Sequence, residues 1–364
     1  MARFVMVTSS LAPSDALGND IRQMARLLTA DGHEVQFAAR ANLVPNLEVW
    51  PLADCRRRLA PEDILIYNHS LALPEGVALF RQHRGPRVLR YHNITPAELL
   101  RPYNAELALG CVRGREETLA LLAAQPTAIW ATSKYTAQEL QSAGAPTRSC
   151  AVFQFHCIDE LHLTPSDATL AASLADGRKN ILTVGRLVPN KAPHRLIEAL
   201  GVMKAQGRPR PRLHIAGKIT PGLENYAESL GARATELGVA EDVKILRDVS
   251  LGGLRALYEN SQLFAIASDH EGFCVPLVEA MSFGLPVVAL AAAVPETVGD
   301  AGILWPTPDV RVWAATFARV LRDEALAAEL RERGHRRYAE NFTLEKTAGV
   351  FRVAVQQLLA GSVR

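Results

Sequence analysis

Short apolar runs alternate with amphipathic helical patterns along the whole of this 364-residue chain. Each apolar run has the length of one buried strand, so the alternation is typical of parallel β-sheets covered by helices. The pattern pauses in the stretch LTPSDATLAASLADGRKN, residues 163–180, and then restarts. We therefore predict an α/β chain of two doubly wound domains with a cleft between them. Ligands of such sheets bind outside the carboxyl ends of the strands.

The expected elements follow from this pattern. In the first half we predict strands over residues 3–9, 33–39, 63–69, 87–93, 128–133 and 149–155. In the second half we predict strands over residues 180–186, 212–218, 242–247, 263–268, 286–290 and 302–305. The predicted helices include residues 19–32, 193–207, 226–238, 251–261, 276–284 and a last amphipathic helix at 345–364.

The composition describes a globular protein with 48% hydrophobic and 21% charged residues and a formal net charge of +2. So balanced a charge gives no reason to expect nucleic acid as a partner. Arginines nevertheless gather in the first half of the chain, at Arg56, Arg57, Arg58, Arg101, Arg113 and Arg115. They form either a solvated basic face or a surface that attracts anionic lipid headgroups or an anionic acceptor.

The sequence also bears on location. Five cysteines without a Cys-x-x-Cys pair favour free thiols in a reducing cytoplasm. The start MARFVMVTSS is interpreted as a first buried strand and not as a signal peptide. No apolar stretch approaches the roughly 20 residues of a membrane span. We expect a cytoplasmic protein whose closest association with lipid is peripheral, at the inner face of the membrane.

The stretch SDHEGFCVPLVEAMSFGLPVVA, residues 268–289, predicts a strand, a loop and a short helix. Pro276 suits the first helical position, where its missing N–H is no loss. Gly284 and Pro286 suit the end of the helix. The helix would direct its unpaired N–H groups toward a diphosphate, and Gly272 would let the ligand approach the backbone closely.

Two glutamates flank this loop, Glu271 on the loop itself and Glu279 in the first turn of the helix. Glu279 would accept two hydrogen bonds from the 2′,3′-diol of a ribose. Glu271 would reach the hydroxyls of a sugar beyond the phosphates. The alternative is that both acids only complement the helix dipole.

A basic element follows the first strand of the second half, in NILTVGRLVPNKAPHRLIEAL, residues 180–200. Gly185 and Arg186 end the strand, and Lys191 precedes the helix. Two such cations would neutralise phosphates and stabilise a departing nucleoside diphosphate. The alternative is a solvated basic loop.

Three weaker signals lie at other turns. Gly217 and Lys218 end a strand where a nucleotide base edge or a phosphate would sit. Val249 lies in a loop that would present backbone groups to a base. Gly18 follows the first strand and would allow a ligand phosphate to approach, with Asn19 as the cap of the next helix, although it is equally a plain turn glycine.

These motifs resemble the donor domain of the family 4 retaining glycosyltransferases of the GT-B fold, which has two Rossmann-like domains facing a central cleft. The similarity spans residues 180–305 and includes the Glu-x7-Glu spacing of that family. The resemblance implies that Arg186 and Lys191 bind the diphosphate of a nucleotide sugar. It implies that Glu279 binds the ribose and Glu271 the sugar. It adds backbone contacts to the donor from Phe273, Cys274 and Val275.

The resemblance also implies a division of labour. Residues 1–165 would bind the acceptor and residues 166–344 the donor, with the helix at 345–364 packing back on the first domain. His92 and Asn93, at the end of a predicted strand, match the position of the family's cleft histidine. His92 would hydrogen-bond the transferred sugar or the acceptor hydroxyl. His69, at the end of the preceding strand, is a lesser candidate for acceptor binding.

No metal site is predicted, because the chain lacks an Asp-x-Asp motif at the donor loop and His156, Cys157, Asp159 and His162 have no zinc spacing. The nucleotide sugar is a substrate, so no cofactor is expected. The resemblance implies front-face transfer, in which the leaving diphosphate takes the proton of the acceptor and no protein nucleophile is needed.

The activity implied is transfer of a hexose to a glycan or lipid-linked acceptor, in polysaccharide or lipopolysaccharide biosynthesis. GDP-mannose is favoured over UDP-sugars on family frequency alone. Two alternatives stay open: a nucleotide-sugar 2-epimerase of the same fold, and a non-catalytic nucleotide-sugar-binding subunit.

Overall fold

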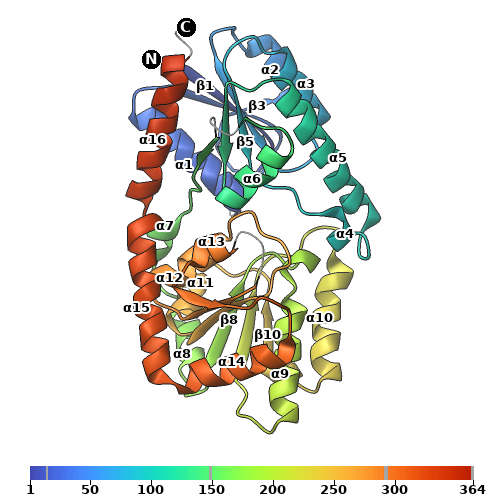
Figure 1. The fold of residues 1–364 in the computed structure, drawn as a ribbon, viewed down its shortest axis with the longest axis vertical. Coiled ribbons are helices and arrows are strands. Elements are labelled where there is room, and N and C mark those ends of the chain that lie inside the picture. Colours follow the sequence, from blue (N-terminus) through green and yellow to red (C-terminus); the bar gives the residue numbers. More distant parts are fainter. Residues whose placement is uncertain (14, 147–149, 291–293, 362–364) are drawn as a thin grey trace. The chain divides into compact units, whose positions relative to one another are not determined.

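The computed structural model describes residues 1–13, 15–146, 150–290 and 294–361 (Figure 1). The chain divides into two compact units. The first comprises Met1–Ala97, Ala108–His156 and the chain from Leu344 onward, and the second comprises Glu98–Leu107 and Cys157–Thr343. The chain thus enters the second unit at Cys157, upstream of the division proposed at 165/166.

The first unit is built on a seven-stranded sheet in the order β3-β2-β1-β4-β5-β6-β7. All of its strand pairs are parallel. The strands are β1 (Arg3–Leu11), β2 (Glu34–Asn42), β3 (Val49–Pro51), β4 (Ile64–His69), β5 (Arg87–Tyr91), β6 (Ala128–Ala131) and β7 (Cys150–Val152). The sheet grows in one direction from β1 to β3 and in the other from β4 to β7, so its topological switch point lies between β1 and β4.

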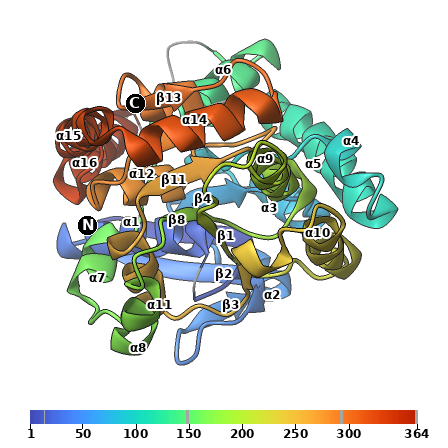
Figure 2. The same cartoon turned by 90° about the horizontal axis from the view of Figure 1, so that it is seen from below.

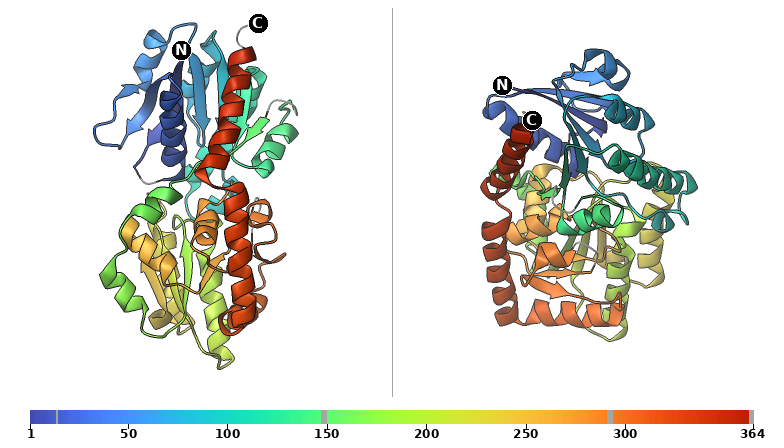
Figure 3. Two further views of the ribbon diagram at one scale, coloured as in Figure 1. Left: turned by 90° about the vertical axis from the view of Figure 1, so that its left-hand side faces the viewer. Right: turned by 45° about the horizontal axis from the view of Figure 1, so that its top comes forward.

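Helices cover both faces of this sheet. They are α1 (Ala16–Ala30), α2 (Leu52–Arg58), α3 (Pro74–Gln82), α5 (Ala105–Ala123), α6 (Lys134–Ser142) and α16 (Leu344–Gly361). The short helix α4 (Ala97–Leu100) belongs to the second unit from Glu98 onward. One face packs against α1 and α16, through residues such as Ile21 and Phe351 (Figure 3). The other face packs against α2, α3 and α5. The alternation of Phe4 and Met6 with Val5 and Val7 along β1 divides the two cores, as the pleat of a strand requires.

The second unit contains a six-stranded sheet in the order β10-β9-β8-β11-β12-β13, again parallel throughout. The strands are β8 (Asn180–Val184), β9 (Arg212–Ala216), β10 (Val243–Leu246), β11 (Leu263–Ile266), β12 (Val287–Ala289) and β13 (Gly302–Leu304). Its switch point lies between β8 and β11. Both sheets are doubly wound, as predicted.

The helices of the second unit also form two layers (Figure 2). They are α7 (Ile158–Leu163), α8 (Ala168–Leu174), α9 (Pro193–Ala205), α10 (Glu224–Glu236), α11 (Leu251–Glu259), α12 (Val275–Ser282), α13 (Val294–Val298), α14 (Val310–Arg322) and α15 (Glu324–Asn341). One core contains residues of α9, α10 and α14. The other contains residues of α7, α8, α11 and α12.

Three local predictions can be compared with the structure. The linker proposed at residues 163–180 contains α8, whose N-terminus is capped by Asp167. Asp15, and not Asn19, caps α1, because its carboxylate accepts a hydrogen bond from Gly18 N. The predicted helix 345–364 is α16, and residues 362–364 lie outside the described part of the chain. Among the described helices, none has both the length and the apolar character needed to cross a bilayer.

Candidate functional site

The switch point of the second sheet carries most of the residues that sequence reasoning selected. Gly185 and Arg186 follow β8, and Glu271 lies in the loop after β11, its hydrogen-bonded neighbour. Parallel strands end at the same edge of a sheet, so these loops meet where doubly wound sheets bind ligands. The asparagine before Lys191 joins the two loops: the backbone N–H of Asp269 donates to Asn190 O at 2.9 Å.

Lys191 and Glu271 form an ion pair at this edge. Lys191 Nζ lies 2.5 Å from Glu271 Oε2, and Ser268 Oγ donates to the other carboxylate oxygen at 2.6 Å. The glutamate side chain is only 4% exposed and the lysine side chain 22% exposed. Because Lys191 has three N–H donors, it can hold Glu271 and still donate to an incoming oxygen. By contrast, the exposed Arg186 side chain makes no hydrogen bond or ion pair with any described residue.

Glu279 lies on α12, where Tyr258 fixes it. The phenol Oη of Tyr258 donates to Glu279 Oε2 at 2.7 Å, and the tyrosine ring is fully buried. Burial raises the pKa of the Glu279 carboxyl, and the hydrogen bond from Tyr258 lowers it in part. Since Tyr258 occupies one carboxylate oxygen, the other remains available to a ligand.

The start of α12 adopts an unusual backbone conformation. Cys274, the N-cap residue, has φ 70° and ψ 71°, in the left-handed region that favours glycine. Its thiol is buried, which raises its pKa well above the ordinary value and keeps it protonated. Phe273 precedes it, with its carbonyl held by Thr297 Oγ1 at 2.8 Å, and Val275 is the first helical residue. The end of the helix matches the prediction, with Gly284 at φ 67°.

Glycines explain how closely the loops approach. A Cβ on Gly217 would lie 1.7 Å from the carbonyl oxygen of Gly185, so only glycine fits there. Gly217 therefore serves the contact between the loops after β8 and β9. Lys218 is exposed next to it. Val249 is half buried and packs in the core of the second unit, directly before the α11 cap Ser250.

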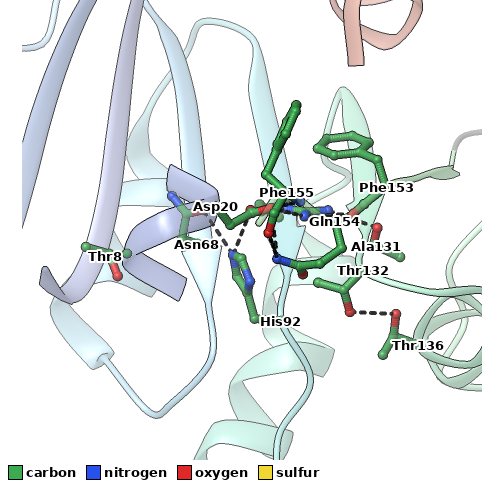
Figure 4. A network of polar contacts seen from close by, with 12 residues as sticks. Thr8, Asp20, Asn68, His92, Ala131, Thr132, Thr136, Phe153, Gln154 and Phe155 are labelled. Atoms are coloured by element: carbon green, nitrogen blue, oxygen red, sulfur yellow. Dashed lines mark hydrogen bonds and ion pairs between the residues drawn. The ribbon is translucent and has the colours of Figure 1, made fainter. Parts of the chain in front are cut away.

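A buried ion pair organises the corresponding edge of the first unit (Figure 4). Arg90 on β5 donates to both carboxylate oxygens of Asp20 on α1, at 2.9 and 2.8 Å, and both side chains are fully buried. Asp20 also accepts from Gln154 Nε2 at 3.1 Å and from Phe155 N at 2.9 Å. Arg90 donates further to the carbonyls of Ala131 and Phe153 and stacks on the ring of Phe153. The pair thus joins α1, β5 and the ends of β6 and β7.

His92 lies beside this pair at the end of β5. Its Nε2 is 3.1 Å from Asn68 Oδ1 and 3.8 Å from Asp20 Oδ2 (Figure 4). Burial, and the charge of Arg90 in second place, lower the pKa of His92 well below its ordinary value, so the ring is neutral. Sequence reasoning selected His92 but missed Asp20, Arg90 and Asn68. The arginine Arg90, within the buried part of the strand RVLRY, was the signal that a buried acid had to face it.

The structure corrects the interpretation of His69. Its ring is fully buried, with Nε2 bonded to Gly114 O at 3.0 Å and Thr118 Oγ1 at 2.9 Å. Burial lowers its pKa to about 4. His69 is therefore a neutral core residue that reaches no acceptor. Asn93 is also buried, at φ 71°, and its Oδ1 accepts from Ile94 N at 2.7 Å.

Gly18 likewise has a local role. It lies in the first turn of α1, where a Cβ would be 2.4 Å from the carbonyl oxygen of Ala12. His162, near the end of α7, stacks on Phe283, and its Nε2 forms a hydrogen bond with Ser282 Oγ at 3.1 Å. Within the described residues, no group of three His, Cys, Asp or Glu side chains is arranged to hold a metal ion.

Comparison with solved structures defines the class of this chain as the GT-B fold. Anabaena Alr3699/HepE in complex with UDP-glucose matches with a TM-score of 0.78 and 19% identity, over 99% of this chain and 100% of that one. WaaG, a glycosyltransferase involved in lipopolysaccharide biosynthesis, matches with a TM-score of 0.73 and 16% identity, over 96% and 98%. At such identities the likeness shows the fold alone.

The sequence of the second unit gives more specific information than the similarity of fold. Residues 169–337 match the family model of the glycosyl transferases group 1. The D-inositol 3-phosphate glycosyltransferase of Salinispora arenicola is 33% identical over 208 residues, which cover 52% of this chain and 46% of that protein. The second unit therefore carries a similarity to the glycosyl transferases group 1 family over residues 169–337. The matched segment spans about half the length of the curated relatives.

Proposed function

We propose that this protein is a retaining glycosyltransferase that moves a hexose from a nucleoside diphosphate sugar to a hydroxyl acceptor. The observation that carries the proposal is the cluster of Lys191, Glu271 and Glu279 around the β8–β11 switch point, inside the segment that matches the family. This edge holds a cation, two carboxylates and a helix N-terminus, the kinds of group that a nucleoside diphosphate sugar would contact.

Each group has a task that follows from its surroundings. The free guanidinium of Arg186 and the ammonium of Lys191 would hold the diphosphate, together with the first N–H groups of α12. The open oxygen of Glu279 would accept from the ribose diol. Glu271, oriented by Ser268, would accept from the hydroxyls of the hexose. Residues of the second unit therefore supply the donor site.

The chemical step needs no protein nucleophile in this proposal. The bond between the sugar and the diphosphate breaks while the acceptor oxygen attacks from the same face. The acceptor proton passes to the departing diphosphate oxygen, and the two cations stabilise the charge that develops on it. The buried Cys274 thiol stays protonated and takes no part. The same cations take the electrostatic role of a metal, so we propose metal-independent transfer.

The first unit would bind the acceptor, with His92 at the reacting end. A glycan or lipid-linked acceptor fits the proposal, with polysaccharide or lipopolysaccharide synthesis as the setting and a cytoplasmic location at or near the membrane. The curated relatives are named for D-inositol 3-phosphate, so an inositol phosphate belongs among the acceptors to be screened. The Anabaena complex contains UDP-glucose, which puts UDP-hexoses beside GDP-mannose among the donors.

A thermal-shift screen of UDP, GDP and their sugars tests the donor site, because a ligand that binds only the folded chain raises its melting temperature. Transfer is then measured with the stabilising sugar over a panel of acceptors. Binding followed by release of nucleoside diphosphate only when an acceptor is present supports the proposal. Turnover without acceptor indicates an epimerase or hydrolase, and binding without any turnover indicates a non-catalytic subunit.

A further inference from the structure

The hydrogen bonds around His92 determine which of its two ring nitrogens carries the proton. Asn68 Nδ2 donates to the carbonyl oxygen of Val7 at 3.2 Å, and the Asn68 side chain is buried. A carbonyl can only accept, so the amide nitrogen must face Val7 and the amide oxygen must face His92. This oxygen lies 3.1 Å from His92 Nε2, which must therefore donate.

A second acceptor faces the same nitrogen. Asp20 Oδ2 lies 3.8 Å from His92 Nε2, and Arg90 fixes the Asp20 carboxylate through two hydrogen bonds. The titratable or charged groups around the ring are Asp20 from α1, Arg90 from β5 and His69 from β4. The positive charge of Arg90 opposes a second proton on the ring and lowers its pKa. The ring is thus neutral with its hydrogen on Nε2.

The remaining nitrogen, Nδ1, makes no hydrogen bond to any residue in the described part of the chain. The side chain keeps 7% of its surface exposed, so a ligand can reach it. Asn68 connects β1 with the end of β5 across the switch point of the first sheet, the position where such a sheet binds its ligand. A neutral ring with Nε2–H leaves a lone pair on Nδ1.

We propose that Asn68 and Asp20 are positioning residues that hold His92 in the Nε2–H form, so that Nδ1 accepts a hydrogen bond from a ligand hydroxyl. The inference rests on the proposed function and narrows it. The group bound at His92 is a hydrogen-bond donor, a hydroxyl of the transferred sugar or of the acceptor. An unprotonated phosphate or carboxylate oxygen has no hydrogen to donate and would be repelled by the lone pair of Nδ1. Such a group is therefore excluded as the partner of His92.

Long-range ¹H–¹⁵N correlation NMR on the ligand-free chain, labelled with ¹⁵N-histidine, tests the tautomer directly. A His92→Gln variant identifies the His92 signals by their loss. We expect a protonated Nε2, an unprotonated Nδ1, and no titration of the ring near neutral pH. A hydrogen on Nδ1, or a charged ring at neutral pH, would overturn the inference. This result needs only the wild-type chain and no variant of Asn68.

Two variants test the positioning role. Asn68→Leu removes the acceptor, and we expect a mixture of tautomers and a fall of about tenfold in kcat/KM with the best donor sugar. Asn68→Asp keeps an oxygen toward Nε2, so it should restore the Nε2–H form and raise the pKa of His92. An unchanged tautomer in a folded Asn68→Leu chain would refute the role. If the tautomer is as expected but no sugar is transferred, the proposed function fails and the hydrogen-bond assignment stands.

Discussion

Replacement of Tyr258 by phenylalanine gives the sharpest test of the ribose site. The change removes one buried hydrogen bond of 2.7 Å to the Glu279 carboxylate and leaves the aromatic ring in place. A hydrogen bond to a charged group contributes about 1.5–3 kcal/mol. We expect the free energy of unfolding to fall by about 2 kcal/mol, measured by urea denaturation. The matched control is Tyr226→Phe, whose hydroxyl bonds the neutral His194 ring at 3.1 Å, and its loss should be nearer 1 kcal/mol.

The same substitution should affect nucleotide binding in a defined way. Without the Tyr258 hydroxyl the Glu279 carboxylate loses the hydrogen bond that orients it, so we expect UDP or GDP to bind about tenfold more weakly by calorimetry. The 2′,3′-dideoxy forms lack the diol and should bind equally to the wild-type and Tyr258→Phe chains. Equal losses for both kinds of nucleotide would refute the assignment of Glu279 to the ribose. Tyr226→Phe should leave both affinities unchanged.

The pH dependence has a definite sign. Burial raises the folded pKa of Glu279 above its unfolded value, so ionisation of this group lowers stability as pH rises through that interval. The diol needs the ionised form, so affinity should fall as pH drops below the raised pKa. The hydrogen bond from Tyr258 lowers the pKa of Glu279, so removing it should move the fall in nucleotide affinity to higher pH.

Four further predictions concern the donor site. Gly217→Ala should destabilise the second unit and weaken nucleotide binding, because its Cβ would overlap Gly185 O. The control is Gly231→Ala on α10, which has open space around it and should be stable and bind nucleotide normally. Arg186→Ala should lower kcat/KM by about a hundredfold, the scale for losing one preorganised donor, with unchanged urea stability. Normal turnover would contradict its role in binding the phosphates. Lys191→Met should destabilise the chain by about 3 kcal/mol, since it leaves Glu271 buried without its cation, and adding Glu271→Gln should recover much of this loss. EDTA should leave transfer rates unchanged, and a loss rescued by manganese would disprove metal-independent transfer.

Much of the fold could be predicted because buried parallel strands leave a strong apolar signal. The short edge strand β3 escaped prediction, since three residues ending in Pro51 carry little pattern. The helix α8 was hidden within a polar stretch, and its place depends on tertiary contacts with α11. Local sequence alone does not encode such contacts.

Some residues of the candidate site could be predicted from the sequence and others could not. Arg186, Lys191, Glu271 and Glu279 were visible because charged residues in the loops and helix that follow the strands stand out from the apolar strands. Asp20 could not be recognised from the sequence, because a single acid in an amphipathic helix is expected on its exposed face. Only the structure shows that Asp20 is buried against Arg90. His69 and His92 occupy equivalent strand ends, and only the packing of Gly114 and Thr118 around His69 separates them.

The helix α16 has a consequence for how the chain acquires its structure during synthesis. Its Phe351 packs against Trp130, Phe153 and Phe155 at 5.4–5.6 Å between ring centres. The residues that begin the first unit therefore leave the ribosome long before the segment that covers them. Since a domain folds only when its parts are present, the second unit can mature first, although it is encoded later. A chain truncated after residue 343 should keep a folded second unit and expose an aromatic, aggregation-prone face on the first.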